Sequence, residues 1–171
     1  PLAIHGAVAL KDGSVVEMKV GEEENDPVFY ISDLLPHLAA KQNEKKLSDG
    51  IGGEDLNIWL GNIPYTLAED EKDKTVKEYL LKLLNEKYGI CEEDFLSAEL
   101  CVVPTYKAKD IGFDRALLGA YGHDDRVCSY PAFTALFDEE NSKHTAMVIL
   151  ADKEEIGSEG NSGMQCGVYE D

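Results

Sequence analysis

A continuous apolar run at residues 145–151 limits what this chain can fold into. An unbroken run of this kind is typical of a strand that is covered on both faces, as in a parallel sheet flanked by helices. The run is followed at once by the acidic residues Asp152, Glu154 and Glu155. Ligands of open α/β sheets bind at the carboxyl edge of the strands, so this pattern predicts an acidic site at a sheet edge.

The charge balance limits the partners of the chain. Its 171 residues include 34 acidic and 16 basic side chains, which give a formal net charge of −18. Such a field repels phosphate backbones and anionic lipid, so we expect neither nucleic acid nor a membrane as a partner. Metal cations remain compatible with it. We also see no apolar run of about 18 residues, the length that a membrane-spanning helix needs.

The first part of the chain predicts short strands joined by polar loops. Asp12 and Gly13 lie between β-prone segments and predict a hairpin. The acidic stretch at residues 21–27 predicts a solvated loop. Beyond it, the sequence predicts a strand at 28–31, a short helical turn at 32–40 and a strand at 56–63.

Longer elements follow. Residues 75–88 predict a helix, because apolar residues recur there at helical spacing and Gly89 provides a C-terminal cap. Residues 98–104 predict a strand that ends at a proline. Residues 126–137 again have helical spacing, but Pro131 has to lie in a first turn or kink the helix.

The cysteines and the chain ends give two further expectations. Cys91, Cys101, Cys128 and Cys166 form no C-x-x-C pair, so zinc-ribbon and thioredoxin motifs are absent and we expect reduced thiols in a cytoplasmic protein. The chain begins at Pro1 without a methionine or a signal-peptide pattern and stops just after a Gly-rich segment. We therefore expect it to be a piece of a longer protein.

Two acidic segments carry the candidate chemistry: residues 123–126, His-Asp-Asp-Arg, and the pair Glu154 and Glu155. A hydrolase with two metal ions needs one carboxylate that bridges the ions, a second that binds one ion and a third that acts as a base. By spacing alone, a solvated acidic surface is the simpler interpretation of such doublets in so acidic a chain.

The order of the motifs resembles the aspartyl aminopeptidase and vacuolar aminopeptidase I family of co-catalytic zinc peptidases. In that family a G-x-x-D-[DN] segment is followed by D-[NK]-E-E-[VI]-G-S-E, and residues 124–126 and 152–159 look like these two signatures. Three further segments match it: Pro1-Leu2 with Gly6, Leu-Pro-His-Leu-Ala at 35–39 and Glu-Leu-Cys at 99–101. The resemblance therefore spans nearly the whole chain.

The resemblance implies a role for each residue of the two signatures. Asp124 would be the carboxylate that bridges two zinc ions, and Glu155 would be a ligand to one of them. Glu154 would be the general base that deprotonates the metal-bound water. Asp125 and Arg126 would support a ligand rather than bind the metal themselves.

Two histidines, His37 and His123, lie in or beside these motifs. His37 lies in the Leu-Pro-His-Leu-Ala segment, which the family places in an inserted interaction domain. The resemblance implies that this histidine reaches the active site of a neighbouring subunit and stabilises the tetrahedral intermediate, with a local structural role as the alternative. His123 is expected to be a polar residue at the start of a helix rather than a ligand.

The predicted fold class is α+β: a small, mostly-β interaction domain with helices at residues 1–103, followed by a partial α/β, zinc-peptidase-like sheet fragment at residues 104–171. Because parallel sheets bury both faces, such a fragment should expose apolar surface. The resemblance also implies zinc ligands in segments outside these residues, so we expect the isolated chain to bind zinc poorly and to be inactive.

The predicted function is that of a metal-dependent aminopeptidase that removes N-terminal residues from peptides through a water activated by two metal ions. The alternatives are a non-catalytic assembly domain of such an enzyme and a degenerate relative without chemistry. The resemblance implies a peptide substrate, two zinc ions in each complete site and a homo-oligomer built as a twelve-subunit shell. The acidic surface and the cysteine usage favour the cytoplasm.

Overall fold

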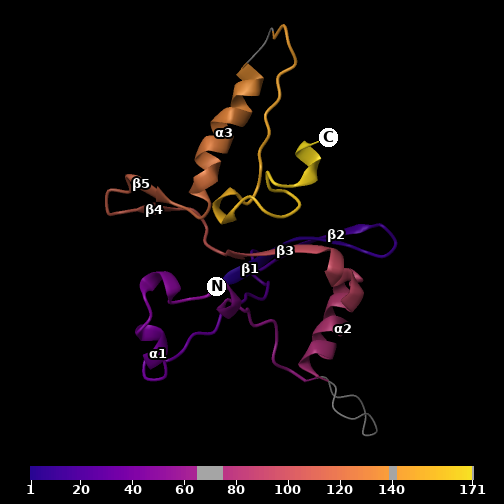
Figure 1. The fold of residues 1–171 in the computed structure, drawn as a ribbon, viewed down its shortest axis with the longest axis vertical. Helices are drawn as coiled ribbons and strands as arrows, with labels where there is room; N and C mark the ends of the chain where they lie inside the picture. The colour runs from indigo at the N-terminus through magenta and orange to yellow at the C-terminus, as the bar shows by residue number, and fades with distance from the viewer. Residues whose placement is uncertain (65–74, 139–141, 171) are drawn as a thin grey trace. The chain divides into compact units, whose positions relative to one another are not determined.

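The computed structural model describes residues 1–64, 75–138 and 142–170 (Figure 1). The chain divides after Thr105 into two units, Pro1–Thr105 and Tyr106–Asp171.

An antiparallel sheet of three strands organises the first unit. Strands β1 (Leu2–Ala9), β2 (Val15–Val20) and β3 (Ala98–Pro104) lie in the order β2–β1–β3. The predicted hairpin is confirmed, because Ala9 pairs with Val15 around the turn. The strand predicted at 98–104 is confirmed as β3, and all of it pairs with β1, from Val8–Ala98 to Leu2–Pro104.

Gly6 allows β1 and β3 to approach closely. Its φ is +150°, and a Cβ built there would lie 1.9 Å from the carbonyl oxygen of Glu99 on β3. An L-residue with a side chain would therefore clash with backbone that cannot move without breaking the sheet. This glycine accounts for part of the resemblance noted around Pro1 and Leu2.

Helix α2 (Val76–Tyr88) is confirmed where the sequence predicts a helix, and both of its ends carry capping residues. Thr75 Oγ1 accepts from Glu78 N, and Glu78 Oε2 accepts from Thr75 N at 2.6 Å, which forms a capping box. Gly89 adopts the left-handed conformation that ends the helix.

The core of this unit lies between the sheet and helix α2. Val8 and Ile90 are fully buried, and Met18 and Val20 from β2 are nearly so. Helix α2 adds the partly buried side chain of Leu84 to the same cluster, together with that of Tyr88. Between Ile90 and β3, the 3₁₀ helix η3 (Glu92–Ser97) leads the chain back to the sheet.

The segment from residue 28 to residue 63 contains less regular structure than predicted. The strands predicted at 28–31 and 56–63 are wrong: the segments make only the isolated bridges Leu2–Phe29 and Ile31–Ile58, because neither finds a continuous partner strand. The helical turn predicted at 32–40 forms in its second half only: Leu38 N donates to Leu35 O at 2.8 Å and Ala39 N donates to Pro36 O at 3.3 Å. Pro36 keeps the residue before it out of a helix. The short helices come later in this segment: α1 (Ala40–Asn43), η1 (Leu47–Asp49) and η2 (Gly53–Asp55).

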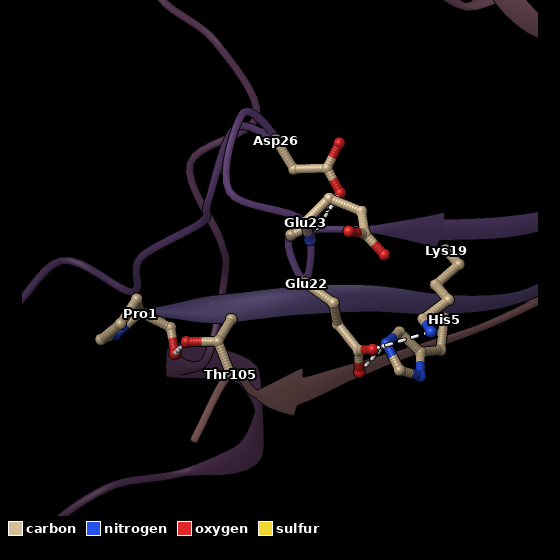
Figure 2. A network of polar contacts seen from close by, with 8 residues as sticks. Pro1, His5, Lys19, Glu22, Glu23, Asp26 and Thr105 are labelled. Carbon is tan, nitrogen blue, oxygen red and sulfur yellow. Dashed lines mark hydrogen bonds and ion pairs between the residues drawn. The ribbon is translucent and has the colours of Figure 1, made fainter. Parts of the chain in front are cut away.

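The acidic loop after β2 is held in place by its own carboxylates (Figure 2). Asp26 Oδ2 accepts hydrogen bonds from the backbone N–H groups of Gly21, at 3.0 Å, and Glu23, at 3.3 Å. Glu22 Oε2 lies 2.9 Å from Lys19 Nζ. Apart from the buried Gly21 and the half-buried Asp26, the loop is exposed as predicted, and these contacts fix its conformation.

The second unit holds a small antiparallel sheet and one long helix. Strands β4 (Lys109–Ile111) and β5 (Leu117–Gly119) pair with each other, and helix α3 (His123–Asp138) follows. The 3₁₀ helices η4 (Glu154–Ile156) and η5 (Gly167–Tyr169) lie near the end of the chain. Pro131 lies inside α3 beyond its first turn, and the departure from helical geometry is at Asp124 instead of Pro131.

The strand predicted at residues 145–151 is wrong for the structure described here. The segment is part of no sheet, and the partial α/β sheet expected in the second part is replaced, among the described residues, by the β4–β5 pair. A strand requires a partner backbone, and this unit offers the segment none. Met147, Ile149 and Leu150 remain 76%, 54% and 52% exposed, so the expectation of exposed apolar surface is confirmed.

At the level of fold class, the chain is α+β with small antiparallel sheets and helices, as predicted. In the described part of the chain, none of the helices combines the length and the apolar character that crossing a membrane requires.

Candidate metal centre

The first part of the candidate site is the start of helix α3. Asp124 has φ −84° and ψ 115°, outside the helical region, and the peptide bond from Asp124 to Asp125 is cis. Arg126 Nη1 donates to the backbone carbonyls of Tyr121 and Gly122, both at 3.1 Å. Arg126 therefore fixes the chain just before the two aspartates, which fits the supporting role implied by the resemblance.

The second part is the turn that carries Glu154 and Glu155. Lys153, immediately before helix η4, has φ 61° in the left-handed region. Its carbonyl oxygen accepts hydrogen bonds from Ile156 N, at 3.3 Å, and Ser158 N, at 2.8 Å. The turn is therefore closed by its own backbone, and the segment that precedes it belongs to no sheet, unlike the strand that the sequence predicts.

These two parts meet. One carboxylate oxygen from each of Asp124, Asp125 and Glu155 lies within 4.8 Å of the other two. About thirty residues separate the aspartates from Glu155 in the sequence. Figure 1 shows the corresponding arrangement, with the start of α3 beside the loops near the C-terminus. The fold thus brings together the two residues that the resemblance implies as metal ligands, Asp124 and Glu155, and adds Asp125.

The electrostatics of the group are those of crowded like charges. The negative charge of Asp124, followed by that of Glu154, raises the pKa of Glu155, with smaller contributions from burial and from Asp125. Partial burial raises the pKa of Asp125, and a hydrogen bond with Asp124 adds to the effect. A bound cation would offset this repulsion.

The donor set fits a divalent cation. Carboxylate oxygens are among the ligands that zinc binds in proteins, together with histidine nitrogens and cysteine thiolates. In the described residues the group consists of three carboxylates, without an imidazole or a thiolate. Asp124, Asp125 and Glu155 could hold part of a metal centre, and the histidine that the resemblance implies would have to come from elsewhere.

The other predicted residues lie outside this group. Glu154 precedes Glu155 in the same turn, and its charge acts on Glu155 although its oxygens are not part of the group. His123 is exposed next to Asp124 and does not join the carboxylates. His37 lies in the first unit, where it is exposed.

The sequence signals undervalued two features. Asp125 is predicted to support a ligand, yet its carboxylate lies with the other two. The contacts of Gln165 and Ser162 within the turn region were not predicted. The aspartate doublet at 124–125 is a sequence signal for the place of Asp125. No local pattern indicates the contacts of Gln165 and Ser162.

Comparison with known proteins decides the family. The family model described as aminopeptidase I zinc metalloprotease (M18) matches residues 1–171. The chain belongs to this family. The family resemblance identified from the two acidic signatures is therefore confirmed.

Individual relatives agree. A protein of Clostridium acetobutylicum named "Probable M18 family aminopeptidase 1" is 54% identical over 170 residues, which cover 99% of this chain and 36% of the relative. The crystal structure of an M18 aminopeptidase from Thermotoga maritima matches with a TM-score of 0.80 and 47% identity, over 99% of this chain and 36% of that one. The structure of aminopeptidase I from Clostridium acetobutylicum matches with a TM-score of 0.79. The chain thus spans little more than a third of the length of these relatives.

Proposed function

We propose that the protein to which this chain belongs is a metal-dependent aminopeptidase, which hydrolyses the bond after the N-terminal residue of a peptide. The observation that carries the proposal is the meeting of Asp124, Asp125 and Glu155 in a chain of the M18 family. Membership of a zinc metalloprotease family supports zinc as the metal, and we propose two ions in the complete site. The activity belongs to the whole protein rather than to these residues alone.

In this proposal the carboxylates hold the metal. Asp124 would be a ligand shared by both ions and Glu155 would be a ligand of one of them, with Asp125 close enough to orient or share in the binding. When bound, zinc polarises the scissile carbonyl and lowers the pKa of a water molecule. The raised pKa of Glu155 is consistent with a group of acids that a cation would stabilise in the ionised form.

Glu154 acts as the general base in this proposal. It takes a proton from the attacking water and returns that proton to the leaving amine. Its place in the 3₁₀ turn, one residue before Glu155, keeps it near the metal ligands but outside the carboxylate group. A base has to remain free of the metal in order to accept a proton, and this placement supports that role.

The test compares variants of the full-length protein. Glu154→Gln should lower kcat by at least 100-fold with zinc still bound, since it removes the base and spares the ligands. Glu155→Ala should lose bound zinc as well as activity. Glu17→Gln, on an exposed position of β2, is the matched control and should behave as the parent. Hydrolysis of aminoacyl p-nitroanilides and zinc content give the two readouts, and a parent protein without such hydrolysis in zinc, cobalt or manganese would refute the proposal.

A second function, assembly, is favoured by the surface of the first unit. Exposed apolar side chains are concentrated in residues 34–63, the part of the chain that follows β2 and precedes α2 in the sequence. They are Leu34, Leu35, Leu38, Leu47, Ile51, Leu56, Trp59, Leu60 and Ile63. Apolar surface on this scale is typical of a face that a partner covers. We propose that residues 1–103 form an interaction domain of a homo-oligomer, a twelve-subunit shell by resemblance, and that residues 104–171 form part of the catalytic domain.

His37 belongs to the same proposal. It lies between the exposed side chains of Leu35 and Leu38, on the segment that we assign to subunit contacts. We propose that it reaches the active site of a neighbouring subunit and stabilises the tetrahedral intermediate. His37→Ala should then lower kcat of the full-length protein, and mixing it with Glu154→Gln subunits should restore part of the activity. Light scattering that finds only monomers would refute both assembly and this role.

We also place the protein in the cytoplasm. All four cysteines are free thiols in the structure, and two of them, Cys91 and Cys128, are exposed. Exposed thiols persist in a reducing compartment, which supports this placement.

A further inference from the structure

The loop that follows residues 153–158, the proposed metal-binding turn, folds back and braces it. Asp152 N donates to Ser162 O at 3.1 Å, and Ser162 Oγ donates to Asp152 Oδ2 at 3.1 Å. These two hydrogen bonds close the base of a loop that spans residues 152–162 and contains Glu154 and Glu155. The turn is therefore anchored at the point where the chain enters it.

A second set of contacts holds the other end of the turn. Gln165 Nε2 donates to the carbonyl oxygen of Gly157 at 2.6 Å, and Gln165 N donates to Ser158 O at 3.2 Å. Gly157 comes directly after helix η4. The side chain of Gln165 thus joins Gly157, the residue after helix η4, to the segment around residue 165.

The two segments are packed too closely for a side chain between them. Gly163 is buried, and a Cβ built there would lie 2.1 Å from Ser158 O and 2.8 Å from Glu159 O. Backbone is in contact with backbone at this point, so the position of residues 163–165 determines the position of the carbonyls that follow Glu155. Gln165 adds a directed hydrogen bond to this contact.

The geometry points to Gln165 as a positioning residue for the metal centre: its amide holds Gly157, and through Gly157 it holds the carboxylate of Glu155 beside Asp124 and Asp125. This inference rests on the proposed role of Glu155 as a metal ligand. Partners that orient a ligand without touching the metal are commonly worth 10- to 100-fold in metal affinity.

Two substitutions separate the hydrogen bond from charge and shape. Gln165→Met keeps the length of the side chain and removes the donor. Gln165→Glu keeps the shape, replaces the donor by an acceptor that repels Gly157 O, and adds a negative charge that would by itself favour a cation. Gln42→Met, at the other glutamine of the chain, is the matched control.

The test titrates the metal-free full-length protein with Co²⁺, followed by visible absorption, and with zinc, followed by equilibrium dialysis. We expect Gln165→Met and Gln165→Glu each to bind both ions about 10- to 100-fold more weakly. Gln42→Met should bind as the parent does. In their metal-free forms, Gln165→Met and Gln42→Met should unfold at about the same midpoint temperature, because the side chain of Gln165 is exposed.

The outcomes distinguish the two proposals. If Glu155→Ala loses the ions while either Gln165 variant binds them with parental affinity, the positioning role is wrong and the proposed function stands. If Glu155→Ala itself binds the ions as the parent does, the proposed metal site is wrong and the role of Gln165 falls with it.

Discussion

Ile90 shows what a single buried residue contributes to this chain. It follows the glycine cap of α2, is 0% exposed and packs in the cluster with Val8 and Val20. Ile90→Ala should lower the free energy of unfolding by about 2–5 kcal/mol, because it removes buried methylene and methyl groups and leaves a cavity. Leu96→Ala, at a side chain that is 93% exposed, should change it by less than about 0.5 kcal/mol. Urea denaturation measures both, and equal losses would contradict the core described here.

Asp26 carries a prediction about pH. Its hydrogen bonds from Gly21 N and then Glu23 N lower its pKa below the ordinary value of an aspartate. Because the pKa is lower in the folded protein, the stabilisation from this group is present above the unfolded pKa of about 3.9 and is lost as the pH falls through the folded pKa. Asp26→Asn removes this titration.

The difference in stability between the parent and Asp26→Asn should therefore be largest near neutral pH and shrink as the pH falls from about 5 to about 2. Other carboxylates titrate in both proteins and cancel in the difference. Urea midpoints across this range measure it, with Glu17→Gln as the control that should parallel the parent. A difference that is constant with pH would show that the charge of Asp26 is not the cause.

At the scale of elements, the sequence predicts correctly those elements whose signals are local, and it fails for elements that need a partner strand. Helix α2 was predictable because Gly89 and the helical spacing lie within the helix or beside it. The unbroken apolar run at residues 145–151 predicts a strand, but a strand also depends on neighbours that a sequence window does not contain. The site follows the same division: the two acidic signatures were visible, whereas the meeting of Asp125 with Glu155 depends on the tertiary fold.

The loop after the proposed metal-binding turn offers a test of close backbone packing. Gly163→Ala would place a Cβ 2.1 Å from Ser158 O, a backbone atom that cannot move aside cheaply. We expect a cost of about 1–3 kcal/mol from overpacking, together with weaker zinc binding by the full-length protein. Gly167→Ala is the matched control, since a Cβ there meets no atom within 4 Å. Calorimetric unfolding and zinc dialysis would contradict the prediction if both variants behaved alike.

At the scale of the whole molecule, the exposed apolar surface and the donor set of three carboxylates both indicate that other parts of the protein contact this chain. Met147, Ile149 and Leu150 are more than half exposed, and the chain spans 36% of the length of a relative that matches 99% of it. Exposed apolar runs are typical of surfaces that other parts of a protein cover. The same missing partners would explain why the carboxylate group contains no imidazole among the described residues.

Zinc stoichiometry tests this interpretation. Zinc centres in proteins take three or four protein ligands for each ion, so three carboxylates cannot complete a site for two ions. The 171-residue chain by itself should therefore retain almost no zinc after equilibrium dialysis, whereas the full-length protein should retain two ions for each subunit. Glu155→Ala, made in the 171-residue chain and in the full-length protein, controls for adventitious binding to so acidic a surface. If the chain alone held two ions, and Glu155→Ala released them, its own residues would suffice for the site and ligands from the rest of the protein would not be needed.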